Sequence, residues 1–119
     1  MAASNDNWGG GAALTTAMAS VGAFPIASSS LDAVVNPTGL VPGNYSVIVS
    51  GVGSATGNVI AEIYDAAANY TPSSPRLINV SVLKPITSGG SLSLGFSVKG
   101  ATATTLLIRV IGPGLAAVG

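Results

Sequence analysis

The segment Ser91-Leu92-Ser93-Leu94-Gly95-Phe96-Ser97-Val98 decides the fold class of this chain. Apolar residues alternate in it with serine and glycine at a strict period of two. That period is typical of a β-strand with one face buried and the other in water. The segment therefore predicts a strand over residues 91–98 whose outer face consists of small, uncharged side chains.

Further segments with strand character lie on both sides of it, separated by turns rich in glycine, proline and asparagine. They are residues 31–36, 45–50, 58–65, 76–84 and 104–111. The last of these is apolar on both faces apart from Arg109, which predicts a central strand. Six strands at short intervals indicate an antiparallel β-sandwich or barrel.

The glycine-rich loop at residues 51–57 allows two interpretations. A phosphate-binding loop needs a helix after it, whose first N–H groups hold the phosphate. Here a predicted strand follows, so we favour a hairpin loop between two strands.

The residues before the first strand have a different pattern. Residues 1–11 predict an irregular entry, and apolar positions in residues 12–21 have helical spacing, with Gly22 placed to end the helix. A chain of 119 residues fits one domain. We therefore expect a single, mainly all-β domain over residues 1–119, an antiparallel β-sandwich with strands within 31–111 and one short N-terminal helix.

Charged residues make up only 7% of the chain, and the net charge is zero. Typical globular chains contain about 25%. The eight charged residues are Asp6, Asp32, Glu62, Asp65, Arg76, Lys84, Lys99 and Arg109. A neutral surface of small residues lacks the repulsion that keeps proteins apart, and it loses little side-chain entropy when covered. Such a surface is suited to packing against copies of itself.

The composition also excludes several partners and reactions. Four dispersed basic residues cannot form a nucleic-acid footprint, and no apolar run approaches the ~20 residues of a membrane helix. Without histidine or cysteine there is no Ser-His-Asp or Cys-His arrangement and no zinc site with nitrogen or sulfur ligands.

Paired carboxylates remain conceivable. Glu62 and Asp65 are separated by an odd offset, which places them on opposite faces of a strand. Asp6 and Asp32 would need the fold to bring them together. We predict that the protein is not an enzyme, with no catalytic residue and no cofactor.

Two groups of residues are candidates for binding. Asn5, Asp6 and Asn7 offer oxygen ligands to Ca²⁺, but an Asx turn explains the run, and we favour the turn. Trp8 and Tyr70 lie in predicted loops, where aromatic rings either stack on sugars or anchor the loops to the core. Arg109 is expected to pair with a carboxylate at a sheet margin, and Glu62 is a candidate partner that sequence alone does not establish.

Three stretches carry a family resemblance. They are Asn5-Asp6-Asn7-Trp8-Gly9; Leu40-Val41-Pro42-Gly43-Asn44-Tyr45-Ser46-Val47 with Gly51-Val52-Gly53 and Glu62-Ile63-Tyr64-Asp65; and Arg76-Leu77-Ile78-Asn79-Val80-Ser81 through Leu107-Ile108-Arg109-Val110-Ile111-Gly112-Pro113-Gly114-Leu115-Ala116. Together they resemble tandem β-sandwich repeats of large secreted and surface proteins of environmental bacteria. The Pro-Gly-Asn-Tyr turn is also loosely similar to bacterial pre-peptidase C-terminal domains. The resemblance implies an extracellular or cell-surface location and a structural, adhesive or spacer role.

The chain departs from this pattern at its ends. In such arrays about 25 residues with one or two strands join the end of one repeat to the next Asn-Asp-Asn-Trp, and these strands are missing here. Either the sequence is cut from an array at an unusual point, or the subunit is an incomplete sandwich. An incomplete sandwich leaves an apolar groove or edge that a neighbouring chain can fill by strand addition. Because donor and acceptor surfaces then differ, the contact can propagate as a filament.

The leading hypothesis is therefore a self-associating structural subunit of an extracellular filament or surface layer, whose partners are other copies of itself. The residues expected at the assembly edge are Leu92, Leu94, Phe96, Val98, Leu106 and Ile108. Lys84-Pro85 and Lys99 are the residues that would protect strand edges from pairing. The alternative is a carbohydrate-binding or adhesive module that contacts surface glycans through Trp8 and Tyr70.

Overall fold

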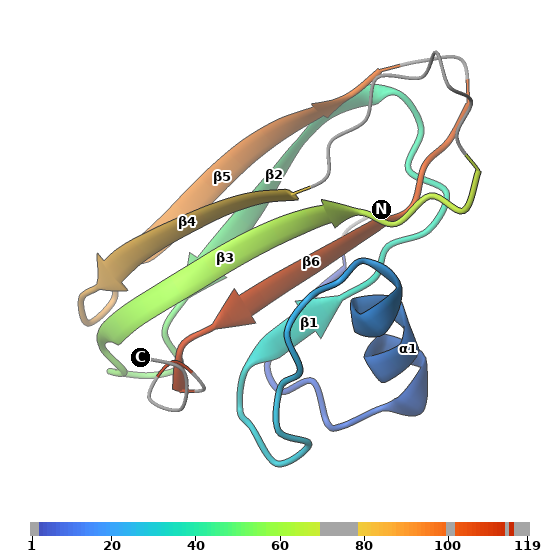
Figure 1. The fold of residues 1–119 in the computed structure, drawn as a ribbon. Coiled ribbons are helices and arrows are strands. Elements are labelled where there is room, and N and C mark those ends of the chain that lie inside the picture. The colour runs from blue at the N-terminus through green and yellow to red at the C-terminus, as the bar shows by residue number, and fades with distance from the viewer. Residues whose placement is uncertain (1–2, 70–78, 100–101, 114, 116–119) are drawn as a thin grey trace.

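The computed structural model describes residues 3–69, 79–99, 102–113 and 115. This part of the chain contains one helix and six strands (Figure 1). They are α1 (Ala12–Ser20), β1 (Ala33–Val35), β2 (Gly43–Ser50), β3 (Gly57–Asp65), β4 (Asn79–Ile86), β5 (Ser91–Val98) and β6 (Leu106–Ile111). The predicted all-β class with one short N-terminal helix is confirmed.

The strands form two antiparallel sheets of unequal width. The large sheet has four strands in the order β1-β6-β3-β4, and the small sheet consists of β2 and β5. Apolar residues on the facing sides of the two sheets form two of the three core clusters. The molecule is therefore a sandwich in which the second layer is half as many strands wide as the first (Figure 1).

Strand β6 is buried on both faces. Leu106 and Ile108 face the small sheet, whereas Leu107 and Ile111 face the layer formed by α1 and its flanking loops. β6 pairs with β1 on one side and with β3 on the other. The central position predicted for this apolar segment is correct.

Helix α1 ends one residue before its predicted end, at Ser20. Gly22 has a φ of +70°, a backbone conformation that glycine adopts more readily than residues with a side chain. The N–H of Gly22 donates to the carbonyl of Ala19 (3.2 Å), and that of Ala23 donates to Met18 (3.0 Å). These two bonds are the Schellman pattern, which satisfies the last carbonyls of a helix. The chain then turns back so that Ala23 packs on the same core cluster as Met18.

Strand β5 has the bounds that its sequence predicts, and its residues alternate between exposed and at least partly buried. Its serines, together with Ser46, Ile48 and Ser50 of β2, form the exposed outer face of the small sheet. Ile48 is 73% exposed at the centre of this face. The outer face of the small sheet carries no charged residue.

The hairpin expected at residues 51–57 is wrong. β2 pairs with β5, whereas β3 pairs with β4 and β6, so this loop crosses from the small sheet to the large one. Glycine-rich turn composition is the same for a hairpin and for a connection between sheets, and only strand pairing separates them. In the described ranges, no helix is long and apolar enough to span a bilayer.

Candidate interaction groove

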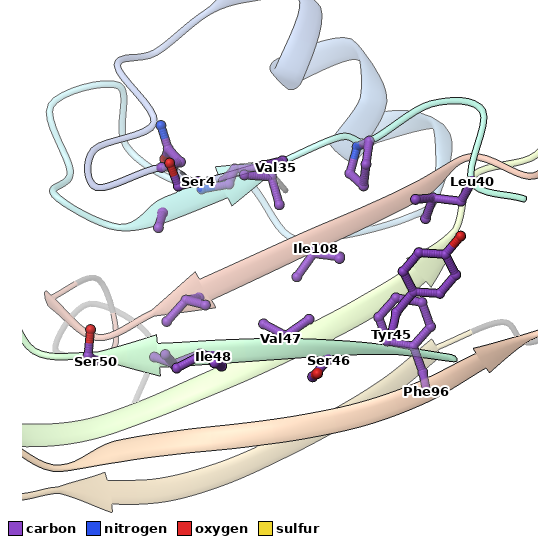
Figure 2. Close-up of a pocket in the computed structure, with 17 residues that line it drawn as sticks. Ser4, Val35, Leu40, Tyr45, Ser46, Val47, Ile48, Ser50, Phe96 and Ile108 are labelled. Atoms are coloured by element: carbon purple, nitrogen blue, oxygen red, sulfur yellow. Dashed lines mark hydrogen bonds between the residues drawn. The ribbon is translucent and has the colours of Figure 1, made fainter. Parts of the chain in front are cut away.

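The unequal widths of the sheets leave part of the large sheet uncovered. A cavity of about 460 Å³ lies beside β2, over the inner face of β1 and β6. Its floor includes Ala33, Val35, Ile108 and Val110, and its wall is strand β2 (Figure 2). This is the position that a further strand of the small sheet would occupy.

A second cavity of about 490 Å³ adjoins the first, at the end of the sandwich where loop 51–57 lies. Ala33, Val49, Ser50 and Val110 line both cavities. We refer to the two cavities together as the β2 groove. Leu31 and Val52 line its second part and are 64% and 69% exposed, so the groove continues onto an apolar surface.

All the described residues that line the first cavity are uncharged. Tyr45 and Phe96 stack at one end of it, with ring centroids 5.4 Å apart and an interplanar angle of 17° (Figure 2). The Tyr45 hydroxyl donates to the carbonyl of Val41 at 2.6 Å, so its polar group is satisfied. The groove therefore offers an apolar floor and an aromatic end.

Among the described lining residues, the carboxylates of Asp6 and Asp32 lie at the far end of the groove, in the second cavity. Asp32 is buried and accepts hydrogen bonds from the Ser30 hydroxyl (2.5 Å) and from the N–H of Gly112 (2.7 Å). These contacts hold the segment before β1 against the segment after β6. Asp32 thus has a structural role in the fold.

The edges of the two sheets are protected to different degrees. The N–H of Val34 in β1 donates to Asn5 Oδ1 (3.0 Å), and that of Trp8 donates to the carbonyl of Asp32 (2.8 Å), so residues 5–8 cover this edge. The edge strand β4 carries exposed Lys84 and Pro85, as predicted for a protected edge.

Strand β2 has neither form of protection. It contains no lysine or proline between Gly43 and Ser50, and β5 is its one pairing partner among the described strands. Its second edge therefore presents backbone donors and acceptors to the groove along eight residues.

A buried ion pair lies on the opposite side of the large sheet. Glu62 of β3 is directly opposite Arg109 of β6, and Arg109 is fully buried. Arg109 Nε and Nη2 both donate to Glu62 Oε2, the former at 2.9 Å, and Nη1 donates to the carbonyl of Phe24 at 2.6 Å. The guanidinium also lies 4.2 Å from the Phe24 ring centre. The pairing with Glu62 is as expected, but it is at the centre of the sheet and not at a margin.

Tyr64 completes this cluster. Its hydroxyl donates to Glu62 Oε1 at 3.2 Å. Burial raises the pKa of Tyr64 above its ordinary value of 10.0, and the negative charge of Glu62 raises it further, whereas Arg109 acts in the opposite direction. The charges of Glu62 and Arg109 satisfy each other and lie away from the groove, so we interpret the cluster as structural.

Of the two aromatic residues considered for sugar binding, Trp8 lies in the core and is not exposed for stacking. Trp8 is only 6% exposed, belongs to the core under α1, and donates from Nε1 to the carbonyl of Ala27 at 3.1 Å. Its ring is therefore a core anchor. Tyr70 lies outside the described residues.

The candidate calcium ligands are engaged in local contacts. Asn5 Nδ2 donates to the carbonyl of Asn7 (3.1 Å), and Asn7 Nδ2 lies 3.4 Å from Asp6 Oδ2. Together with the bond from Val34 to Asn5, these contacts join the segment to itself and to β1. They differ from the bond of an Asx turn, in which a side-chain oxygen accepts from the backbone N–H two residues on. Glu62 and Asp65 differ in burial, and only Glu62 belongs to the buried polar set.

The residues predicted for an assembly edge lie on two different strands. Leu106 and Ile108 lie on β6, which is paired on both sides, so for these two the prediction is wrong. Leu92, Leu94, Phe96 and Val98 lie on β5, whose one partner among the described strands is β2, so β5 is an edge strand, although the side chains of Leu92 and Val98 are buried between the sheets. Phe96 and Ile108 do line the groove, but as its end and floor.

Sequence reasoning did not single out β2, whose unpaired edge lies beside the groove. The signal was present: Tyr45, Val47 and Val49 alternate with polar or exposed positions in a segment without lysine or proline. What was lacking was the strand order, which decides whether such a segment lies at an edge.

No family model matches the chain, and neither the curated proteins nor the solved structures contain a significant match. The resemblance to tandem β-sandwich repeats therefore stays a prediction from the residues quoted for it.

Proposed function

We propose that this protein is a structural subunit that associates with copies of itself by β-strand addition at the β2 groove. The observation that carries the proposal is the unprotected edge of β2 above an apolar floor. The buried backbone groups of an added strand would bond to this edge, and its apolar side chains would cover the floor.

The two edges of the large sheet support this assignment by contrast. Residues 5–8 cover β1, and Lys84 and Pro85 protect β4. The second strand of the small sheet, β5, also has one edge without a partner among the described strands, and what distinguishes β2 is the apolar cavity beside it. A long apolar edge without protection is an aggregation hazard unless pairing there serves a purpose.

The chemistry of the groove favours a peptide over other apolar ligands. A lipid chain or small hydrophobic molecule would cover Val35 and Ile108 but would leave the backbone N–H and C=O groups of β2 without partners. An unsatisfied buried backbone group costs about 1 to 3 kcal/mol. A peptide strand satisfies the edge and the floor together.

The family resemblance adds a cellular location to the proposal. It implies export and a location outside the cell or on its surface, where an assembly of such subunits would form a filament or a surface layer. The lack of charge on the outer face of the small sheet is compatible with close lateral packing of copies.

The proposal is tested by the size of the purified protein as its concentration rises. Sedimentation velocity should show association for the wild type, and Val35→Lys should abolish it by placing an ammonium group on the groove floor. The matched control is Val41→Lys, because Val41 is 61% exposed and lies outside the groove lining. A wild type that stays monomeric at high concentration would refute the proposal, as would equal loss in both variants.

A further inference from the structure

Building on this proposed function, we infer that the groove accepts a single extended segment of a second copy, a segment that lies outside the two sheets of its own subunit. Edge-to-edge pairing of two intact sandwiches is the competing geometry. The two differ in symmetry, because strand insertion joins unlike surfaces and edge pairing of β2 with β2 joins like ones.

The width of the large sheet decides against edge-to-edge pairing. β6 and β1 extend beyond β2 and form the floor of the groove. In a two-fold pairing of β2 with β2 of another copy, strands would be about 4.8 Å apart and both large sheets would face the same side. Each large sheet would then extend past the symmetry axis into the volume of the other.

Other strands of an intact copy meet a related obstacle. A strand of an intact second copy could enter the groove in two orientations. If the other sheet of that copy lies on the same side as the groove floor, it collides with β1 and with residues 5–8, which lie along β1. If the other sheet lies on the side away from the floor, the entering strand presents its solvent-exposed face to the apolar floor. For β5 that outer face consists of serine and glycine. Only a segment with no layer behind it fits the groove.

The lack of charge in the groove favours a second copy of this chain as the source of the inserted segment. The residues seen to line the first cavity carry no charge, and burying an unpaired charge there is unfavourable. A typical protein segment of eight residues contains about two charged residues. In this chain, residues 7–31, which precede the first strand, contain none. A neutral run longer than the groove requires is thus present outside the sheets of this chain and is uncommon in other proteins.

Head-to-tail insertion has a consequence that edge pairing lacks. Each subunit then has one acceptor groove and one donor segment, so the assembly stays open and grows. A subunit with a blocked groove still donates its segment to a wild-type groove, but it accepts none. Such a subunit terminates the chain.

The test mixes wild type with Val35→Lys, and with Ala33→Lys as a second blocking variant, and follows the size distribution by sedimentation velocity. Circular dichroism first establishes that each variant is folded, and Val41→Lys is the control subunit. We expect the wild type to form species larger than dimers, and an equimolar mixture with either blocking variant to fall to about two subunits on average. The control mixture should keep the wild-type distribution.

Two outcomes would overturn this inference while leaving the proposed function intact: a closed dimer as the largest wild-type species, or wild-type assemblies whose length blocked subunits do not change. A blocked subunit incorporated at internal positions would count as the second outcome. A monomeric wild type would instead contradict the proposed function itself.

Discussion

Arg109 has no exposed surface, and its stability in the core depends on Glu62, the carbonyl of Phe24 and the two aromatic rings beside it. Removal of one partner of a buried ion pair leaves the other charge without compensation. We expect Arg109→Met to lower the free energy of unfolding by about 3 to 5 kcal/mol. The measurement is urea denaturation followed by circular dichroism.

The matched control for this prediction is the double variant Arg109→Met with Glu62→Leu, which removes both charges. It should recover most of the lost stability, because an apolar pair of similar volume replaces a buried ion pair at little cost. A single variant as stable as the wild type would show that Glu62 is not buried as the structure describes.

Tyr64 gives the core a dependence on alkaline pH. Because burial and the charge of Glu62 raise its pKa above 10.0 in the folded state, the unfolded chain loses this proton first. The contribution of Tyr64 to stability is therefore complete below the unfolded pKa of 10.0 and is lost as the pH rises through the higher pKa of the folded state. Unfolding free energies of wild type and Tyr64→Phe, measured between about pH 8 and about pH 11, should show a steeper decline for the wild type. Parallel curves would contradict the raised pKa.

At the scale of elements, strand β4 tests whether Lys84 and Pro85 prevent another strand from pairing with the edge of the large sheet. Lys84 and Pro85 are exposed on this edge strand. We expect Lys84→Thr with Pro85→Val, made in the Val35→Lys background, to restore association through a new edge. Lys and Pro hinder strand pairing by charge and by loss of a backbone donor. The control is Lys84→Arg in the same background, which keeps both a positive charge and Pro85 on the edge of β4. A double variant that remains monomeric in sedimentation would show that these residues do not protect the edge.

The elements could be predicted from sequence where their pattern is local. The alternation at 91–98 gave β5 its bounds, and Gly22 correctly placed the end of α1 to within a residue. What sequence could not supply was pairing between distant segments. Strand pairing makes residues 51–57 a loop between the two sheets and not a hairpin. Pairing and register also place Glu62 directly opposite Arg109. Register depends on contacts far apart in the chain, which a local period does not encode.

The groove illustrates the same limit. The apolar residues of β2 and β5 were recognisable, but the side on which the sandwich is open follows from the strand order alone. Trp8 shows the converse case, in which a residue in a predicted loop is a core residue, because its loop folds back over the large sheet.

At the scale of the whole molecule, the few charges present are unevenly distributed. Of the seven charged residues within the described ranges, Asp32, Glu62 and Arg109 are buried, so much of the little charge in the sequence lies away from the surface. Contacts between copies at the β2 groove would consist of apolar burial and backbone hydrogen bonds. Neither is screened by salt, whereas attraction between exposed charges is.

Assembly should accordingly be insensitive to sodium chloride. Between about 20 mM and about 500 mM salt, a range that shortens the Debye length several-fold, we expect the association constant to change by less than about threefold. Ammonium sulfate should strengthen association, because sulfate is excluded from protein surfaces and favours the burial of apolar groups. Sedimentation equilibrium of the wild type in the two salts measures both effects. If sodium chloride dissociated the assembly, charged residues such as Asp6, Lys84 and Lys99 would have to hold it together, and the uncharged groove would not be the contact.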